Sequence, residues 1–274
     1  MQTTARLLQP PPRLSGCLLA AFYRDTREAD LSDEDRINYF PASPLVAVTR
    51  ILCGELRLFP PTGDWREAAA SLPMPVLSAT GPKDTPIASW SAGEVTACTV
   101  SFYYDAWLKL GGRADFSDIP ASIATAMEAF DPETKPERGW DGFCDALAPA
   151  WQRARPTSWP GLSGVGDWAR AALARAAFSN VGRSLRSIER RTKRATGQTR
   201  RSLEFYDAFE NLHRIVVSHP DSSPAEIAQQ AGYADQSHMG RYVRRATGFS
   251  PARLNRAIKT QEAFWCYRLL GERF

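Results

Sequence analysis

The spacing of apolar residues changes along the chain from a strand-like to a helical pattern. Up to about residue 115, short runs rich in β-branched residues are separated by Pro and Gly, as in Leu45–Cys53, Leu56–Phe59 and Glu94–Tyr104. The glycine between the first two runs predicts that they form a hairpin. A short helix is expected over Asp105–Leu110, because two glycines follow it.

Beyond Pro120 the apolar positions recur every three or four residues, which indicates helices. We therefore predict an α+β protein with a first domain over residues 1–155, β-rich to about residue 115 and then helical. The segment Arg153–Gly164 contains two prolines and two glycines and is the best linker candidate. A second, all-helical domain is predicted over residues 163–274.

The helical domain contains an internal repeat. Ile188–Gly197 realigns with Met239–Gly248 at a constant offset of 51 residues. Five positions of the first copy recur unchanged in the second, namely Arg190, Arg194, Ala195, Thr196 and Gly197. The sequence therefore indicates one structural unit present twice.

The second copy has the signals of a helix-turn-helix. Ser223 and Glu226 form a capping box around the start of one helix, which Gly232 ends. Asp235 then caps a second helix over Gln236–Thr247. Two short helices across a glycine turn predict a helix-turn-helix.

The second helix of this unit is amphipathic. Met239, Val243 and Ala246 lie three and four residues apart, so they are expected to face the core. The opposite side carries small and polar residues, namely Gln236, Ser237, Gly240, Arg241 and Arg244. A recognition helix presents such side chains near its N-terminus to the major groove.

The first copy has the same design with Ser184 at the cap. Its predicted inward stripe consists of Leu185, Ile188, Thr192 and Ala195, and its outward stripe of Arg186, Glu189, Arg190 and Lys193. A helix over Asp167–Phe178, with Phe178 among its buried residues, is expected before it. A long connecting helix over Leu203–Val217 is expected between the copies.

The charge divides unevenly between the two halves. Residues 1–150 contain 13 Lys and Arg against 20 Asp and Glu, whereas the rest of the chain contains 21 against 10. The second half therefore suits a polyanionic partner. Of its 21 cations 19 are Arg, which contacts phosphates and base edges in a bidentate way. A solvated basic face is the alternative interpretation of the charge taken alone.

The segments Ala234–His238 and Gly248–Pro251 resemble the AraC/XylS family of transcriptional regulators. The likeness extends over about residues 163–260 and implies two helix-turn-helix units that read successive major-groove segments of double-stranded DNA. Three residues depart from the family pattern, because Thr192, Met239 and Val243 stand where Phe is common, so looser packing is expected. The DNA-binding candidates are Arg186, Ser187, Glu189, Arg190, Lys193, Gln236, Ser237, His238, Gly240, Arg241 and Arg244.

The same resemblance implies a β-rich, often cupin-like N-terminal domain that binds a small-molecule effector or dimerises. A homodimer and RNA polymerase are further candidate partners on this ground alone. All three histidines lie in the second half, so neither a metal site in the first domain nor a cofactor is expected. No phosphate loop, nucleophile elbow or catalytic triad can be assembled, and no catalytic residue is predicted.

Two broader alternatives stay open on the sequence. The protein is either a sequence-specific regulator or a non-specific, architectural DNA-binding protein, and its first domain either senses a ligand or only mediates protein interaction. The five scattered cysteines fit reduced thiols. No apolar run reaches about 18 residues and no signal peptide is recognisable, so a cytoplasmic protein without a membrane segment is expected.

Overall fold

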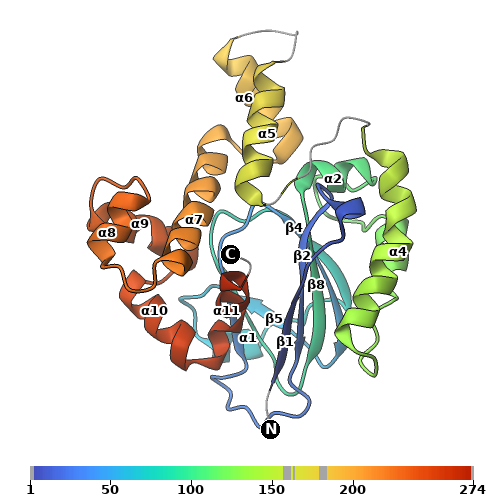
Figure 1. Ribbon diagram of the computed structural model, residues 1–274. Coiled ribbons are helices and arrows are strands. Elements are labelled where there is room, and N and C mark those ends of the chain that lie inside the picture. Colours follow the sequence, from blue (N-terminus) through green and yellow to red (C-terminus); the bar gives the residue numbers. More distant parts are fainter. Residues whose placement is uncertain (1–2, 157–161, 163, 179–183, 273–274) are drawn as a thin grey trace.

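The computed structural model describes residues 3–156, 162, 164–178 and 184–272. A strand-rich N-terminal region and a helical C-terminal region lie side by side (Figure 1), which confirms the predicted α+β class. Half of the predicted linker over 153–164 lies outside the described residues, so the domain boundaries at 155 and 163 stay a prediction.

Two antiparallel sheets form the N-terminal region. The larger sheet has five strands in the order β1 (Thr4–Leu8), β2 (Leu18–Asp25), β8 (Thr96–Phe102), β4 (Val46–Cys53) and β6 (Leu77–Thr80). The smaller sheet has the order β3 (Ile37–Phe40), β7 (Ile87–Trp90) and β5 (Arg57–Phe59). Val48 and Val100 lie opposite each other in the larger sheet and are fully buried.

The predicted hairpin between residues 45–53 and 56–59 is wrong, although both strands exist. β4 pairs with β6 and β8, whereas β5 pairs with β7 in the other sheet. Gly54 has φ +76°, and a Cβ there would lie 2.1 Å from the carbonyl oxygen of Glu94. Only glycine permits this close approach of two backbones. The chain therefore passes from one sheet to the other at Gly54.

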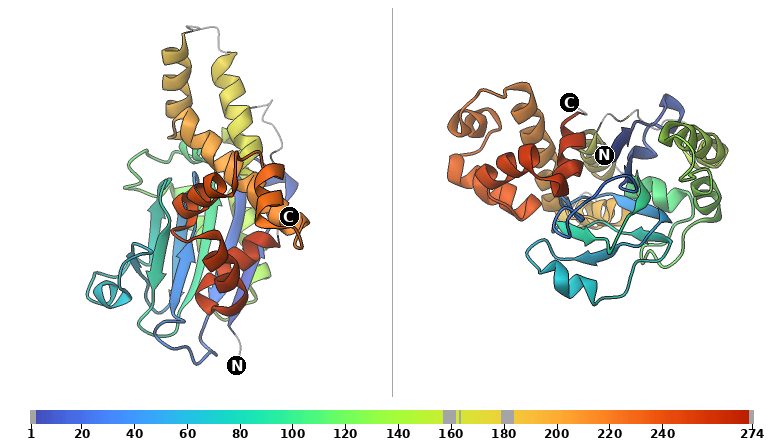
Figure 2. Two further views of the ribbon diagram at one scale, coloured as in Figure 1. Left: turned by 90° about the vertical axis from the view of Figure 1, so that its left-hand side faces the viewer. Right: turned by 90° about the horizontal axis from the view of Figure 1, so that it is seen from below.

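Helices cover one side of the larger sheet (Figure 2). The short helix predicted after the last strand is α2 (Tyr104–Lys109), followed by α3 (Ala121–Met127) and α4 (Pro136–Ala154), while α1 (Trp65–Ala69) lies beside the smaller sheet. The buried residues of α4 include Phe143, Leu147 and Trp151, each four positions from the next. These side chains join the main hydrophobic core with Trp107 of α2.

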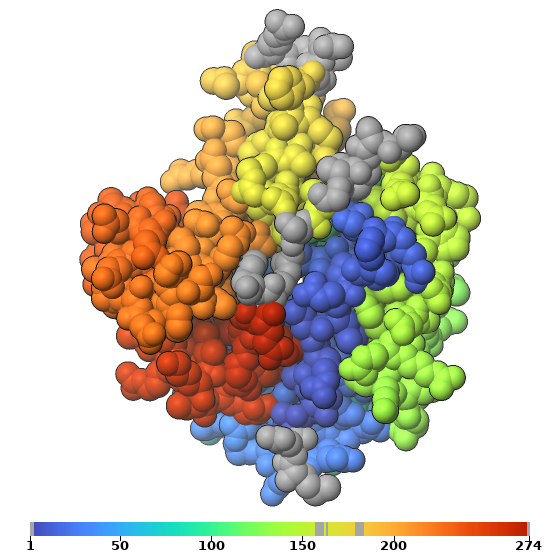
Figure 3. All heavy atoms as spheres, viewed as in Figure 1, coloured from blue at the N-terminus to red at the C-terminus, as the bar shows by residue number. Residues whose placement is uncertain are grey.

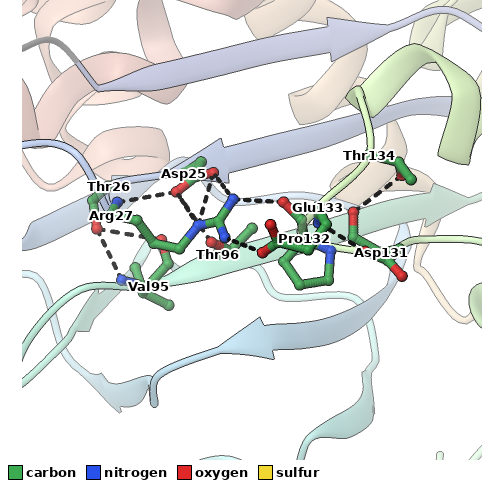
Figure 4. A network of polar contacts seen from close by, with 9 residues as sticks. All are labelled: Asp25, Thr26, Arg27, Val95, Thr96, Asp131, Pro132, Glu133 and Thr134. Carbon is green, nitrogen blue, oxygen red and sulfur yellow. Dashed lines mark hydrogen bonds and ion pairs between the residues drawn. The ribbon is translucent and has the colours of Figure 1, made fainter.

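Arg27 connects the end of β2 to the loop before α4 through hydrogen bonds and ion pairs (Figure 4). Its guanidinium lies 2.9 Å from Asp25 and 2.7 Å from Glu133, and it also donates to the carbonyl of Pro132. Asp25 in turn accepts a hydrogen bond from Thr96 in β8. The polar network therefore holds the helical layer in register with the larger sheet.

The C-terminal region consists of helices. They are α5 (Val165–Ala177), α6 (Leu185–Thr196), α7 (Arg200–Ser218), α8 (Pro224–Gln230), α9 (Gln236–Thr247), α10 (Pro251–Thr260) and α11 (Trp265–Gly271), with a short 3-10 turn at Glu262–Phe264 before α11. A second 3-10 turn, Pro12–Leu14, lies between β1 and β2 of the N-terminal region. The predicted connecting helix is α7, and α5 packs along it.

Two residues predicted to be buried in this region are exposed. Phe178 is 86% and Leu185 is 85% exposed. Phe178 lies at the C-cap of α5, beyond its buried stripe, and Leu185 is the first residue of α6. The buried side of α6 starts a turn later, with Ile188 half-buried and Thr192 fully buried.

The last helix, α11, packs against β1 and β3, so the first and last elements of the chain lie side by side (Figure 3). The indole nitrogen of Trp265 donates to Asn38 over 2.7 Å, and Arg24 forms an ion pair of 2.6 Å with Glu262. Tyr39 packs against Phe264 with ring centroids 4.8 Å apart. Apolar and polar contacts together hold the C-terminal helices on the strand-rich region.

Candidate nucleic-acid interface

The sequence repeat corresponds to two equivalent helices. α6 and α9 begin at Leu185 and Gln236 and end at Thr196 and Thr247, so both ends keep the 51-residue offset. Each helix ends at a glycine with positive φ, 69° in the first copy and 82° in the second. Glycine is the residue that enters this conformation without strain, which explains why it recurs.

The threonine that precedes the glycine in each copy makes the same hydrogen bonds in both. The hydroxyl of Thr196 donates to the carbonyl of Thr192 over 2.7 Å, and that of Thr247 donates to the carbonyl of Val243 over 2.8 Å. Each hydroxyl also accepts from the backbone N–H two residues later. Both threonines are fully buried, so the repeated Ala-Thr-Gly sequence is a buried helix ending.

The second unit has the predicted caps and core. Ser223 and Glu226 form the capping box of α8, and Asp235 accepts from the backbone N–H of His238 at the start of α9. Met239 is 3% and Val243 is 6% exposed, and Ala246 is fully buried. The predicted inward stripe of α9 is therefore confirmed.

Most predicted contact residues of α9 face solvent. Gln236, Ser237, Arg241 and Arg244 are exposed, whereas His238 and Gly240 are half-buried. The His238 ring packs edge-on against Tyr242, with centroids 5.3 Å apart. Next to Gly240 the nearest atom to an added Cβ is Pro251 Cδ at 4.0 Å. His238 therefore packs against its own helix, whereas the space beside Gly240 would admit a side chain.

The outward side of α6 is similarly open. Arg186, Glu189, Arg190 and Lys193 are exposed, and Ser187 is half-buried with its N–H donating to the cap residue Ser184. Thr192 is fully buried, and its hydroxyl donates to the carbonyl of Ile188 over 3.0 Å. The departure from Phe at this position is therefore accommodated without an unpaired polar group.

The exposed cations of the two helices lack carboxylate partners. Within the described part of the chain, Arg186, Arg190, Lys193, Arg241 and Arg244 form no ion pair, whereas Arg170 of α5 pairs with Asp167 and Asp207 at 2.7 and 2.6 Å. Cations without an internal counter-charge can contact phosphates without first breaking an ion pair. The outward sides of α6 and α9 thus combine positive charge with Glu and Gln side chains.

Two other arginines of these helices contact other parts of the chain, which the sequence did not predict. Arg191 donates to the carbonyl of Ala176 over 2.7 Å and so joins α6 to the end of α5. The guanidinium of Arg245 stacks over Phe205, 4.1 Å from the ring centroid. In the sequence, only their positions at the edge of the inward-facing stripe of each helix distinguish these two arginines from the outward-facing cations.

Other kinds of site find no support among the residues that the structure describes. No group of three or more His, Cys, Asp or Glu side chains could hold a metal ion there. None of the described helices is both long and apolar enough to cross a membrane.

The comparison with known proteins matches the C-terminal region to a described family. Residues 178–257 match the family of helix-turn-helix domains designated HTH_18. This range contains α6 to α9 and most of α10. No curated protein matches the chain.

Solved structures of ToxT from Vibrio cholerae are similar at low identity. An apo form shares 9% identity with a TM-score of 0.39 and covers 85% of this chain and 95% of its own. A form with bound unsaturated fatty acid shares 9% identity with a TM-score of 0.37 and covers 79% and 93%. Likeness at this level does not establish a shared function. The family match, together with the duplicated capped helices, identifies the C-terminal region as an AraC-type helix-turn-helix domain, which is a DNA-binding domain of transcription regulators.

Proposed function

We propose that the protein is a sequence-specific transcription regulator whose α6 and α9 read successive major-groove segments of double-stranded DNA. The observation that carries the proposal is the recurrence of Arg190 and Arg241 at equivalent, exposed positions without a carboxylate partner in the described residues. A repeat that served only packing would need to keep its inward stripe and not an outward arginine. In this proposal residues 163–274 are the DNA-binding domain.

The side chains beside these arginines favour base readout over purely electrostatic binding. Arg pairs bidentately with guanine, Gln236 can pair with adenine, and Glu189 can accept from the cytosine amino group. Architectural proteins rely on phosphate contacts and on apolar wedges in the minor groove. An exposed Glu on the binding side weakens phosphate contact and contributes only if it selects a base.

We further propose that the N-terminal region, residues 1–155, modulates DNA binding. A cavity of about 210 Å³ lies between the strands and α11, with Phe22, Phe40 and Trp265 among its apolar walls and Arg24 and Asn38 among its polar ones. A small-molecule effector in this cavity would contact both regions, because Trp265 belongs to the C-terminal helices. A homodimer, contact with RNA polymerase and a cytoplasmic location are parts of the proposal that rest on the family resemblance.

Substitution of the equivalent arginines tests the DNA-binding part. Arg241→Ala and Arg190→Ala should each weaken binding to a selected site by about 1–3 kcal/mol and relax the preference at one base pair. Arg153→Ala, an exposed arginine of α4, is the matched control and should leave affinity unchanged. An equal loss on selected and random duplexes would make both residues phosphate contacts and favour the architectural function.

A melting experiment tests the modulation. A panel of small apolar metabolites is added to the full chain, and a ligand of the folded protein should raise the melting temperature in a concentration-dependent way. Trp265→Ala should reduce that shift. A panel without effect would favour an N-terminal region that serves protein interaction alone.

A further inference from the structure

Leu185, the first residue of α6, is an exposed apolar residue on an otherwise polar side of this helix. Its side chain is 85% exposed. It precedes Glu189 by four residues, so the two side chains lie on the same side of α6. Glu189 is exposed as well, together with Arg186 and Arg190. Leu185 therefore lies directly beside the candidate contact residues of the first unit.

The N-terminal region contacts α6 near the end that is far from Leu185. There α2 approaches the helix, and a Cβ on Gly197 would lie 2.9 Å from the Tyr104 ring. α5 and α6 project beyond the strand-rich region (Figures 1 and 2). Helical side chains lean toward the N-terminus of their helix, so the first residue extends past its start. Because a recognition helix presents its N-terminal residues to base edges, Leu185 is placed to reach them.

The charges around Leu185 suit DNA better than an apolar protein partner. Arg186 and Arg190 form no ion pair with any residue that the structure describes. Burying such cations in an apolar interface is costly, whereas phosphates stabilise them. In the major groove, the apolar group that base pairs present is the 5-methyl group of thymine. An exposed leucine among free arginines therefore fits contact with this methyl group.

We propose that Leu185 is a specificity-determining residue that contacts the methyl group of a thymine in the half-site bound by α6. The equivalent residue of the second unit, 51 positions later, is Gln236, which is also exposed and the first residue of its helix. Gln pairs with adenine, so this position would read an A·T pair in both units, through a different base in each. The proposal rests on the proposed function, because it requires α6 in the major groove.

The test compares thymine with deoxyuridine, which lacks the 5-methyl group and keeps every hydrogen-bonding group of the base. In a duplex that carries the site selected by the full chain, each thymine is replaced in turn. We expect one replacement in one half-site to weaken binding by about three- to fivefold, because one methyl group loses its apolar contact. Leu185→Ala should weaken binding to the unmodified site by a similar factor and no longer distinguish thymine from deoxyuridine at that position.

Leu72→Ala is the matched control. Leu72 is 90% exposed and lies in the loop after α1, which is at the opposite end of the molecule from α6 (Figure 1). This variant should bind both duplexes as the unaltered protein does. Because Leu185 is so exposed, Leu185→Ala should also keep the melting temperature of the unaltered protein. A loss of thymine recognition in Leu185→Ala then reports the contact with DNA and not the fold.

Three results would overturn the proposal. The first is an unaltered protein that is insensitive to deoxyuridine at every thymine, and the second is a sensitivity that persists in Leu185→Ala. The third is a changed oligomeric state of Leu185→Ala in sedimentation with its DNA binding intact, which would assign Leu185 to an interface between copies. A chain that selects no site would refute the proposed function as well, whereas a selected site without thymine dependence would refute this proposal alone.

Discussion

The ion pair between Arg24 and Glu262 should contribute measurably to the docking of the C-terminal helices, and Glu262→Gln tests this. The carboxylate lies 2.6 Å from Arg24 and 2.9 Å from Arg268, and it also accepts from the Thr3 hydroxyl. Arg24 is 5% exposed, and its buried Nε atom has no hydrogen-bond partner among the residues that the structure describes. The substitution keeps the shape of the side chain and removes the negative charge between two guanidinium groups.

The magnitude follows from the burial of the two partners. Removing one member of a fully buried ion pair costs about 3–5 kcal/mol, because the remaining charge is left uncompensated. The Glu262 side chain is 26% exposed, and Gln keeps one accepting oxygen. We therefore expect the free energy of unfolding to fall by about 2–3 kcal/mol at pH 7.

Chemical denaturation followed by tryptophan fluorescence measures this loss, since Trp265 lies beside the pair with its ring 5.2 Å from the Arg24 guanidinium. Glu137→Gln is the matched control. Glu137 pairs with Arg6 at 3.8 Å and both side chains are 57% exposed, so its loss should cost about 0.5 kcal/mol or less. A double-mutant cycle with Arg24→Met isolates the energy of the pair itself.

The pH dependence of the stability difference between the two proteins can refute this reasoning. Burial opposes ionisation of Glu262, but Thr3 and the two arginines hold its pKa below the ordinary value of 4.5. The stabilisation is therefore complete above about pH 4.5 and is lost as the pH falls through the lowered pKa. The difference between the two proteins should shrink on acidification below pH 4.5. A difference that stays constant on acidification, or no difference at pH 7, would refute the reasoning.

Three other substitutions give independent checks. Met239→Asp brings a carboxylate into the core of the second helix-turn-helix, where Met239 is 3% exposed, and should abolish its cooperative melting by circular dichroism; an unchanged transition would contradict the inward stripe. Gly240→Ala should raise the free energy of unfolding by about 1 kcal/mol in denaturant titrations, since the added Cβ meets nothing closer than 4.0 Å, and a loss of stability would show strain there. Burial raises the pKa of Asp105, which lies 2.8 Å from Arg175 and 2.9 Å from Trp168. The wild-type protein should therefore lose stability relative to Asp105→Asn as the pH rises from below 3.8 through this raised pKa. Stability curves of the two proteins that run parallel with pH would contradict this.

The sequence predicted the parts of the site that depend on local signals. The caps at Ser184, Ser223 and Asp235 and the ends of both repeated helices are properties of a few adjacent residues. The stripe of α9 follows from helical spacing alone. These features and the α+β class could therefore be predicted from the sequence without knowledge of the fold.

Features that join distant segments could not be predicted in this way. The two strands on either side of Gly54 resembled a hairpin because a short stretch of sequence does not show which distant strand each will pair with. The contact of Trp265 with Asn38, the contacts of Arg191 and Arg245 within the chain, and the cavity between the strands and α11 could not be predicted for the same reason. Phe178 matched the helical period of α5 but lies past its last turn, where the period no longer determines burial.

Selection of binding sites from a random pool of duplex DNA, with affinities measured at two salt concentrations, tests the central claim most directly. Specific and non-specific binding separate in this measurement, because non-specific affinity comes from counterion release. The account predicts an enriched motif of two half-sites with centres about 10 base pairs apart, bound well above random DNA at both salt concentrations. Uniform affinity for all sequences with a steep dependence on salt would contradict it.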